Sequence, residues 1–135
     1  MSAETKKILV VDDEEDFVEL LTFNLRRRGY RVTAAYDGAG ALSAARRDDP
    51  DLILLDYMLP GMDGMSVLRC LRQFDASRRI PIVMVTARLD SPLIFEAVRC
   101  GVTDVMHKPF SMKDLTRWVE HWLSPAGLEP VDRRA

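Results

Sequence analysis

Two patterns of hydrophobic and polar positions alternate along the chain. Short aliphatic runs, typical of buried strands, alternate with stretches whose apolar side chains recur every three or four residues, as in amphipathic helices. The predicted strands are 8–11, 30–35, 52–55, 82–85 and 104–107. The predicted helices are 14–28, a short helix capped by Asp37, 65–74, 92–100 and a last helix after Ser111. Five strands alternating with five helices predict an α/β fold, a parallel sheet covered by helices on both faces.

The order of the strands follows from the handedness of their connections. Right-handed crossovers leave mainly doubly wound arrangements, and five βα units suit the flavodoxin-like order 2-1-3-4-5. Residues 52–55 are aliphatic at every position, as expected of a central strand that is buried on both faces. Residues 30–35 are more polar, which predicts an edge strand.

Some apolar and cationic residues are assigned structural roles. Arg26–Arg28 precede Gly29, a pattern typical of a helix end, and this favours compensation of the helix dipole over anion binding. Cys70 and Cys100 have no metal-ligand spacing and are predicted to be buried thiols. The last helix begins with a capping box and presents an apolar face on which at least one tryptophan should be core. That face comprises Leu115, Trp118, Val119 and Trp122.

Composition narrows the class of protein. The chain has 135 residues, 47% hydrophobic and 30% charged, as expected of one globular domain. Its net charge of −2 does not suggest a nucleic-acid-binding module. No apolar run approaches the ~18 residues of a membrane span, and residues 1–7 lack the apolar region of a secretory signal. A cytoplasmic location without membrane contact is the resulting expectation.

Polar side chains stand where four of the predicted strands end. In open parallel sheets ligands bind at the carboxyl ends of the strands, so these residues are predicted to converge. Three carboxylates among them repel one another, and a hard divalent cation that accepts carboxylate oxygens, best Mg²⁺, relieves that repulsion. The residues are Asp12 and Asp13, Asp56, Thr86 and Lys108.

This set of residues suggests a chemistry. Asp56 follows four large aliphatic residues, so its carboxylate is predicted to be at least half buried and to need a partner. A carboxylate can attack phosphorus and form an aspartyl phosphate. Mg²⁺ at Asp12 and Asp13 and the ammonium of Lys108 would neutralise the phosphoryl charge, and the Thr86 hydroxyl would donate a hydrogen bond.

The sequence resembles the receiver domain of two-component response regulators. Four segments carry the resemblance in the family's order, and together they span roughly residues 6–123. They are ILVVDDEED (8–16), DLILLDYMLPGMDG (51–64), PIVMVTA (81–87) and HKPF (107–110). The resemblance implies that Asp56 accepts a phosphoryl group from a sensor histidine kinase or phosphotransfer protein. A downstream protein or output domain would read that state, with a phosphorylation-linked homodimer as one form of response.

The resemblance also implies individual roles around the metal. Asp13, Asp56 and the backbone carbonyl of Met58 would bind Mg²⁺ directly, and Asp12 would act through metal-bound water. Thr86 and Lys108 would each bind a phosphoryl oxygen once the acceptor is modified.

The resemblance implies a switch more than an enzyme. One residue that the family uses for its conformational change differs in this chain. Receivers usually carry Tyr or Phe three residues before the lysine, and this chain has Val105. Signalling is therefore predicted to rely on the loop after Thr86 and on the helix at 92–100. The peptide bond before Pro109 is expected to be cis. Residues 1–123 are expected to form the receiver, and 124–135 a tail or linker stub.

Three other functions remain alternatives. A phosphatase of the aspartyl-phosphate class would need D-x-D on the first strand, but the acids here are adjacent. An FMN-binding flavodoxin would need Ser, Thr and Gly donors after that strand, where residues 12–16 are all acidic. A receiver-like scaffold not regulated by phosphorylation would not need the complete set of site residues.

Overall fold

The computed structural model describes residues 5–74, 80–88 and 90–124. Its single five-stranded sheet is parallel throughout, in the order β2-β1-β3-β4-β5, which confirms the predicted fold. The strands are β1 (Lys7–Val11), β2 (Arg31–Ala35), β3 (Leu52–Asp56), β4 (Ile82–Thr86) and β5 (Asp104–His107). The helices are α1 (Glu15–Arg27), α2 (Gly38–Asp48), α3 (Gly64–Phe74), α4 (Ser91–Arg99) and α5 (Met112–Leu123).

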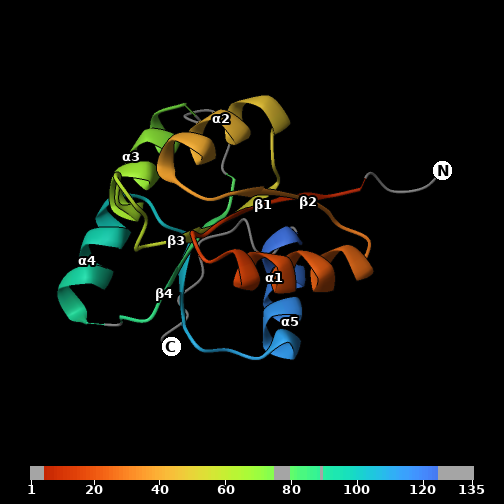
Figure 1. Cartoon of the computed structure of the whole chain (residues 1–135). Coiled ribbons are helices and arrows are strands. Elements are labelled where there is room, and N and C mark those ends of the chain that lie inside the picture. The colour runs from red at the N-terminus through yellow and green to blue at the C-terminus, as the bar shows by residue number, and fades with distance from the viewer. Residues whose placement is uncertain (1–4, 75–79, 89, 125–135) are drawn as a thin grey trace.

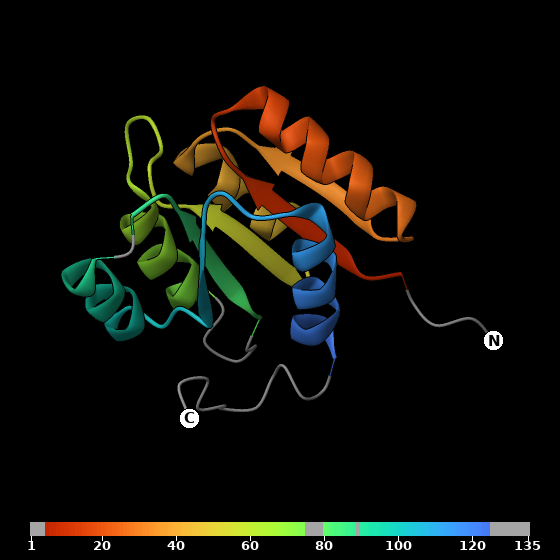
Figure 2. The same cartoon turned by 90° about the horizontal axis from the view of Figure 1, so that it is seen from below.

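Helices cover both faces of the sheet (Figures 1 and 2). α2, α3 and α4 lie on one face, and α1 and α5 lie on the other. Alternate side chains of β1 supply the two cores, because Leu9 and Val11 pack toward α2 and α3 while Ile8 and Val10 pack toward α1 and α5. All five residues of β3 are buried, as predicted for a central strand.

Side-chain caps begin several of the helices. Asp37 accepts a hydrogen bond from the backbone N–H of Gly40, and Ser111 accepts one from that of Asp114, as the sequence predicts. Asp63 caps α3 in the same way through the N–H of Ser66, a cap that was not predicted. These caps fix where each helix starts relative to the strand before it.

The two tryptophans of α5 lie in different environments. Trp122 is 1% exposed, and its indole N–H donates to Oδ2 of Asp104 at 3.2 Å. Trp118 is 43% exposed and meets Trp122 edge to face, with ring centroids 5.9 Å apart. The prediction that at least one of them belongs to the core is confirmed.

The two cysteines are less buried than predicted. Cys70 and Cys100 are both only half-buried. Cys70 lies beside the stripe of α3 that enters the core, and Cys100 follows the last turn of α4, where Arg69 donates to its sulfur at 3.6 Å. None of the helices in the described part of the chain is long and apolar enough to span a membrane.

Candidate functional site

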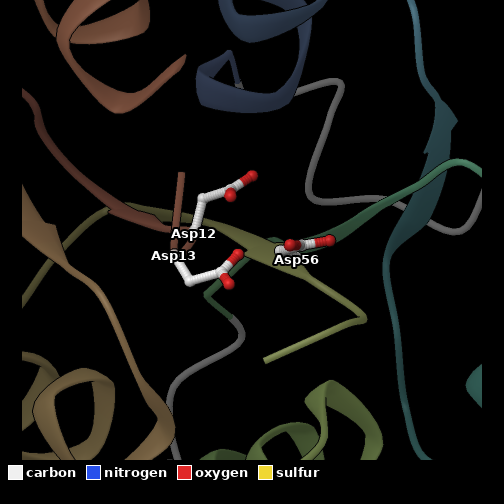
Figure 3. Close-up of side chains that lie close together, drawn as sticks. All are labelled: Asp12, Asp13 and Asp56. Atoms are coloured by element: carbon white, nitrogen blue, oxygen red, sulfur yellow. The ribbon is translucent and has the colours of Figure 1, made fainter. Parts of the chain in front are cut away.

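The predicted polar residues meet where the strands end, a region called the carboxyl edge from here on. Asp12 and Asp13 follow β1, and Asp56 is the last residue of β3. Figure 3 shows these three side chains next to one another, and one oxygen from each carboxylate lies within 4.8 Å of the others. The predicted convergence of the three acids is therefore confirmed.

Strand register explains why two of these acids are neighbours. Val11 pairs with Leu55 across β1 and β3, so the next residues, Asp12 and Asp56, leave the sheet side by side. Asp12 is 1% exposed and Asp56 is 5% exposed, whereas Asp13 is exposed. Two carboxylates are thus held close together out of solvent, which is unfavourable without a cation.

Lys108 supplies part of the missing positive charge. Its ammonium donates to Oδ2 of Asp12 at 2.9 Å and lies 3.9 Å from Oδ1 of Asp56. The backbone N–H of Lys108 donates to the carbonyl of Thr86 at 2.8 Å, which ties the residue to the end of β4. The Lys108–Pro109 peptide bond is cis, as the resemblance implies.

The surroundings of Asp56 make its carboxyl group harder to ionise than an exposed one. Burial is the main reason that its pKa is raised to about 6, and the charge of Asp12 raises it further. Lys108 and the backbone N–H of Met58, 3.3 Å from Oδ1, act in the opposite direction but do not restore the usual pKa. Burial alone lowers the pKa of Lys108, yet its hydrogen bond to Asp12 and the surrounding carboxylates outweigh that effect and raise it.

The donor set fits a magnesium ion. All three side chains offer oxygen ligands, which hard divalent cations prefer. Three carboxylates share one lysine ammonium here, so the site still carries an excess of negative charge. A divalent cation among these oxygens would remove that excess, and Asp13 is exposed enough to leave room for water ligands.

The hydroxyl of Thr86 lies at the end of β4 and is connected to the next helix. Thr86 is fully buried, and its Oγ1 accepts from the backbone N–H of Arg88 at 3.0 Å. The Arg88 guanidinium makes two hydrogen bonds to Oδ2 of Asp90, and Oδ1 of Asp90 caps α4 at Leu93. A chain of hydrogen bonds thus joins Thr86 to the start of α4.

Gly64 allows α3 to begin directly beside the site. A Cβ at this position would lie 2.5 Å from the backbone oxygen of Asp56 and 2.7 Å from the Cα of Tyr57. The N–H of Gly64 also donates to the carbonyl of Tyr57 at 2.8 Å. The glycine therefore serves close backbone approach, which holds the loop after Asp56 against the helix.

Two residues of the site were not predicted. Glu14 precedes the first turn of α1, but its carboxylate makes no cap and lies 3.5 Å from the Lys108 ammonium. The ring of Phe17 lies 4.5 Å from the same ammonium. The only sequence signal was their position one and four residues after Asp13, which does not say where their side chains point.

Val105 occupies the position where the resemblance leads one to expect an aromatic ring. It is half-buried and packs against the core on the α2–α4 face. Met58 exposes 62% of its surface beside the site, while its backbone N–H holds Asp56.

Comparison with known proteins agrees with the fold and the site. A family model described as the response regulator receiver domain matches residues 8–120. The chain therefore belongs to the response regulator receiver domain family, and the three acids at its carboxyl edge fit the phosphorylation site of that family.

Full-length relatives are longer than this chain. The DNA-binding response regulator MtrA of Mycolicibacterium smegmatis is 41% identical over 132 residues, which cover 98% of this chain and 57% of MtrA. The alkaline phosphatase synthesis transcriptional regulatory protein PhoP of Bacillus subtilis is 46% identical over 115 residues, covering 85% of this chain and 47% of PhoP. The chain thus spans about half the length of the curated relatives it matches.

Solved structures show the same architecture. The chemotaxis response regulator CheY4 of Vibrio cholerae superimposes with a TM-score of 0.82 at 28% identity, covering 87% of this chain and 98% of that one. A CheY-like receiver domain protein of Methanospirillum hungatei superimposes with a TM-score of 0.84 at 24% identity, over 89% and 94% of the two chains. The second likeness concerns the fold alone.

Proposed function

We propose that Asp56 accepts a phosphoryl group from a phosphohistidine of a sensor histidine kinase or phosphotransfer protein. The chain would then act as a phosphorylation-controlled switch for a downstream protein or output domain. One observation supports this most strongly: a nearly buried carboxylate lies at the sheet's carboxyl edge, 3.9 Å from a lysine ammonium and beside two further acids. A carboxylate with a purely structural role would not be stabilised by two further acids at this distance.

The proposed reaction is a displacement at phosphorus. A carboxylate oxygen of Asp56 attacks the phosphorus atom, the phosphorus–nitrogen bond breaks, and the histidine nitrogen leaves with the electron pair and takes up a proton. With a pKa of about 6, Asp56 is mostly ionised at neutral pH and can act as nucleophile. Lys108 is placed to bind one phosphoryl oxygen, and the Thr86 hydroxyl to bind another.

In this proposal Asp13, Asp56 and the backbone carbonyl of Met58 hold Mg²⁺, and Asp12 reaches it through water. When bound, the ion neutralises the negative charge of the acids and of the transferring phosphoryl group. Asp12 meanwhile orients Lys108 through the 2.9 Å hydrogen bond to its ammonium.

The test is incubation with Mg²⁺ and acetyl phosphate, followed by intact-mass measurement. The expected result is a single phosphoryl adduct, which is lost in Asp56→Asn and on chelation of Mg²⁺. Asp63→Asn is the matched control, because Asp63 caps the neighbouring helix and should still allow the adduct. An unmodified wild type, or an adduct that persists in Asp56→Asn, would contradict the proposal and favour a scaffold without phosphorylation.

The proposed switch runs through α4. If the Thr86 hydroxyl turns toward the phosphoryl group, the N–H of Arg88 loses its acceptor, and the Arg88–Asp90 cap of α4 can rearrange. Val105 lacks an aromatic ring to follow that movement. Amide NMR shifts with and without a phosphoryl mimic should therefore change most at 86–94; unchanged shifts there would exclude this route.

The proposal also covers the domain boundaries of the chain and its oligomeric state. Residues 1–123 would form the receiver unit and 124–135 a tail, which is supported by the family match over 8–120; residues 1–4 and 125–135 lie outside the described part. DNA binding, named for MtrA, would belong to a separate output domain. A homodimer that forms on phosphorylation is checked by sedimentation of the modified and unmodified chain.

A further inference from the structure

The opposite side of the sheet, where the strands begin, contains a cationic hollow, here called the amino-edge hollow. β1 and β2 both begin at the right of Figure 1. The hollow has a volume of about 440 Å³, within the usual range of small-molecule sites. Its lining comprises Lys7, Arg26, Tyr30, Arg31, Val32, Thr33, Arg47 and Asp48.

The register of the strands brings these cations together. Lys7 pairs with Arg31 across β1 and β2, so both side chains leave the same face of the sheet, the face covered by α2. Arg47 and Asp48 come from the last turn of α2. Arg26 approaches from α1 and donates to the carbonyl of Val32, over the free edge of β2.

The cations of the hollow are poorly neutralised. Asp48 is the single carboxylate of the lining; its hydrogen bond from Arg47 is the main cause of its lowered pKa, so it stays charged. Lys7 donates to the backbone carbonyl of Asp48 and Arg26 to that of Val32, and the one carboxylate of Asp48 attracts Lys7 as well as Arg47. Within the described part of the chain, the guanidinium of Arg31 makes no hydrogen bond or ion pair, while its backbone N–H donates to the carbonyl of Lys6 at 2.9 Å.

Helix dipoles do not account for all of this charge. α1 and α2 both end here, and each carboxyl end contributes about half a negative charge. Those two ends together offset about one cation, while four cations and one carboxylate line the hollow. The dipole role predicted for the arginines at 26–28 thus explains Arg26, but it does not explain Lys7 and Arg31, which belong to strands.

We infer that the amino-edge hollow binds a small molecule bearing two or three linked phosphate groups. Guanidinium groups match phosphate geometry, and ligands of two to four negative charges balance the excess of positive charge. Tyr30 and Val32 add a ring and an apolar surface, which suit a nucleoside attached to the phosphates. This site lies away from Asp56, so it is independent of the proposed phosphorylation.

Calorimetric titration with inorganic triphosphate tests this inference. The buffer contains EDTA and about 50 mM salt, where charges are only partly screened. Arg31→Gln should weaken binding at least about tenfold, the loss of one charge-assisted contact. Arg99→Gln removes the same charge from the end of α4 and should change binding less than about twofold.

On addition of triphosphate, amide NMR shifts should change at residues 30–33. If Arg31→Gln fails to fold, Lys7→Gln takes its place and should weaken binding in the same way. Tighter binding of ATP than of triphosphate identifies a nucleotide; equal binding identifies the phosphates alone. No saturable binding, equal weakening by Arg99→Gln, or tighter binding of hexaglutamate would overturn the inference, the last in favour of an acidic peptide.

Discussion

The carboxyl edge and the amino edge of the sheet both gather charged side chains, but they hold them differently. At the carboxyl edge, Asp12 and Asp56 are nearly inaccessible to solvent and share one lysine. At the amino edge, Arg31 and Arg47 are exposed to solvent and screened by it. The same Coulomb interaction is several times stronger at the drier edge.

This difference in burial shows at which edge a change of charge can drive a conformational change. A charge added at Asp56 changes a set of groups that are already coupled, because Lys108 lies 2.9 Å from Asp12 and 3.9 Å from Asp56. A charge bound at the amino edge meets exposed side chains and water. We therefore expect substitutions at the carboxyl edge to change stability much more than equivalent ones at the amino edge.

The largest effect is expected from removal of the shared cation. Lys108→Met leaves Asp12 and Asp56 without their partner, and we expect the free energy of unfolding to fall by about 3 kcal/mol at pH 8. Urea unfolding followed by circular dichroism, without Mg²⁺, measures it. Arg47→Met at the amino edge is the matched change, and an equal loss there would remove the distinction between the edges.

A smaller effect of opposite sign is expected from Asp56→Asn. The carboxyl has a pKa of about 6 in the folded chain and an ordinary value of 3.8, so the folded state binds the proton more tightly. Wild-type stability should therefore fall as pH rises from about 4 to about 6 and then level off. Asn cannot ionise, so the variant should be about 2 kcal/mol more stable at pH 8 and equal to wild type near pH 4.

The same urea titrations at several pH values measure this difference. A variant less stable than wild type at pH 8, or a gap that does not close in acid, would show that Asp56 is not electrostatically strained. Asp12→Asn should lower the pKa of Asp56, because it removes the second largest cause of the raised pKa.

The next largest effect on the free energy of unfolding is expected from magnesium. About 10 mM Mg²⁺ should stabilise the chain by about 1–2 kcal/mol if it exceeds the dissociation constant ten- to thirtyfold. Asp13→Asn should abolish most of this gain, whereas Arg31→Gln at the amino edge should leave it intact. Equal stabilisation of all three proteins would place the ion elsewhere.

The smallest effect is expected from Asp48→Asn at the amino edge. Its carboxylate is hydrogen-bonded by Arg47 in partly exposed surroundings, so the change in unfolding free energy should stay within about 0.5 kcal/mol. The pKa of Asp48 is lowered, so the sign is a slight loss above pH 4. A loss above about 1 kcal/mol would mean that this edge is more tightly coupled than its exposure indicates.

Most of the fold could be predicted from the sequence because aliphatic runs and helix stripes are local signals. The convergence at the carboxyl edge was also predictable, since parallel strands bring their ends together. The strand boundaries differ slightly: Asp56 and Thr86 were taken to follow their strands, but they are the last residues of β3 and β4.

Long-range side-chain placement was not predictable. Glu14 reaches Lys108, 94 residues away, because α1 and the loop after β5 pack on the same face. Arg72 likewise donates to the carbonyls of Gly101 and Ile80, which ties α3 to the residues after α4 and before β4. No local pattern encodes such contacts, because they depend on how separate elements meet.

The tryptophan pair of α5 makes intrinsic fluorescence a local probe of this protein. The chain has two tryptophans, both on one helix and in edge-to-face contact, so its indole fluorescence reports on α5 and the adjacent β5. The exposed Trp118 should be quenched by acrylamide while Trp122 is protected. A partner that covers α5 would therefore reveal itself by a change in quenching, without any added label.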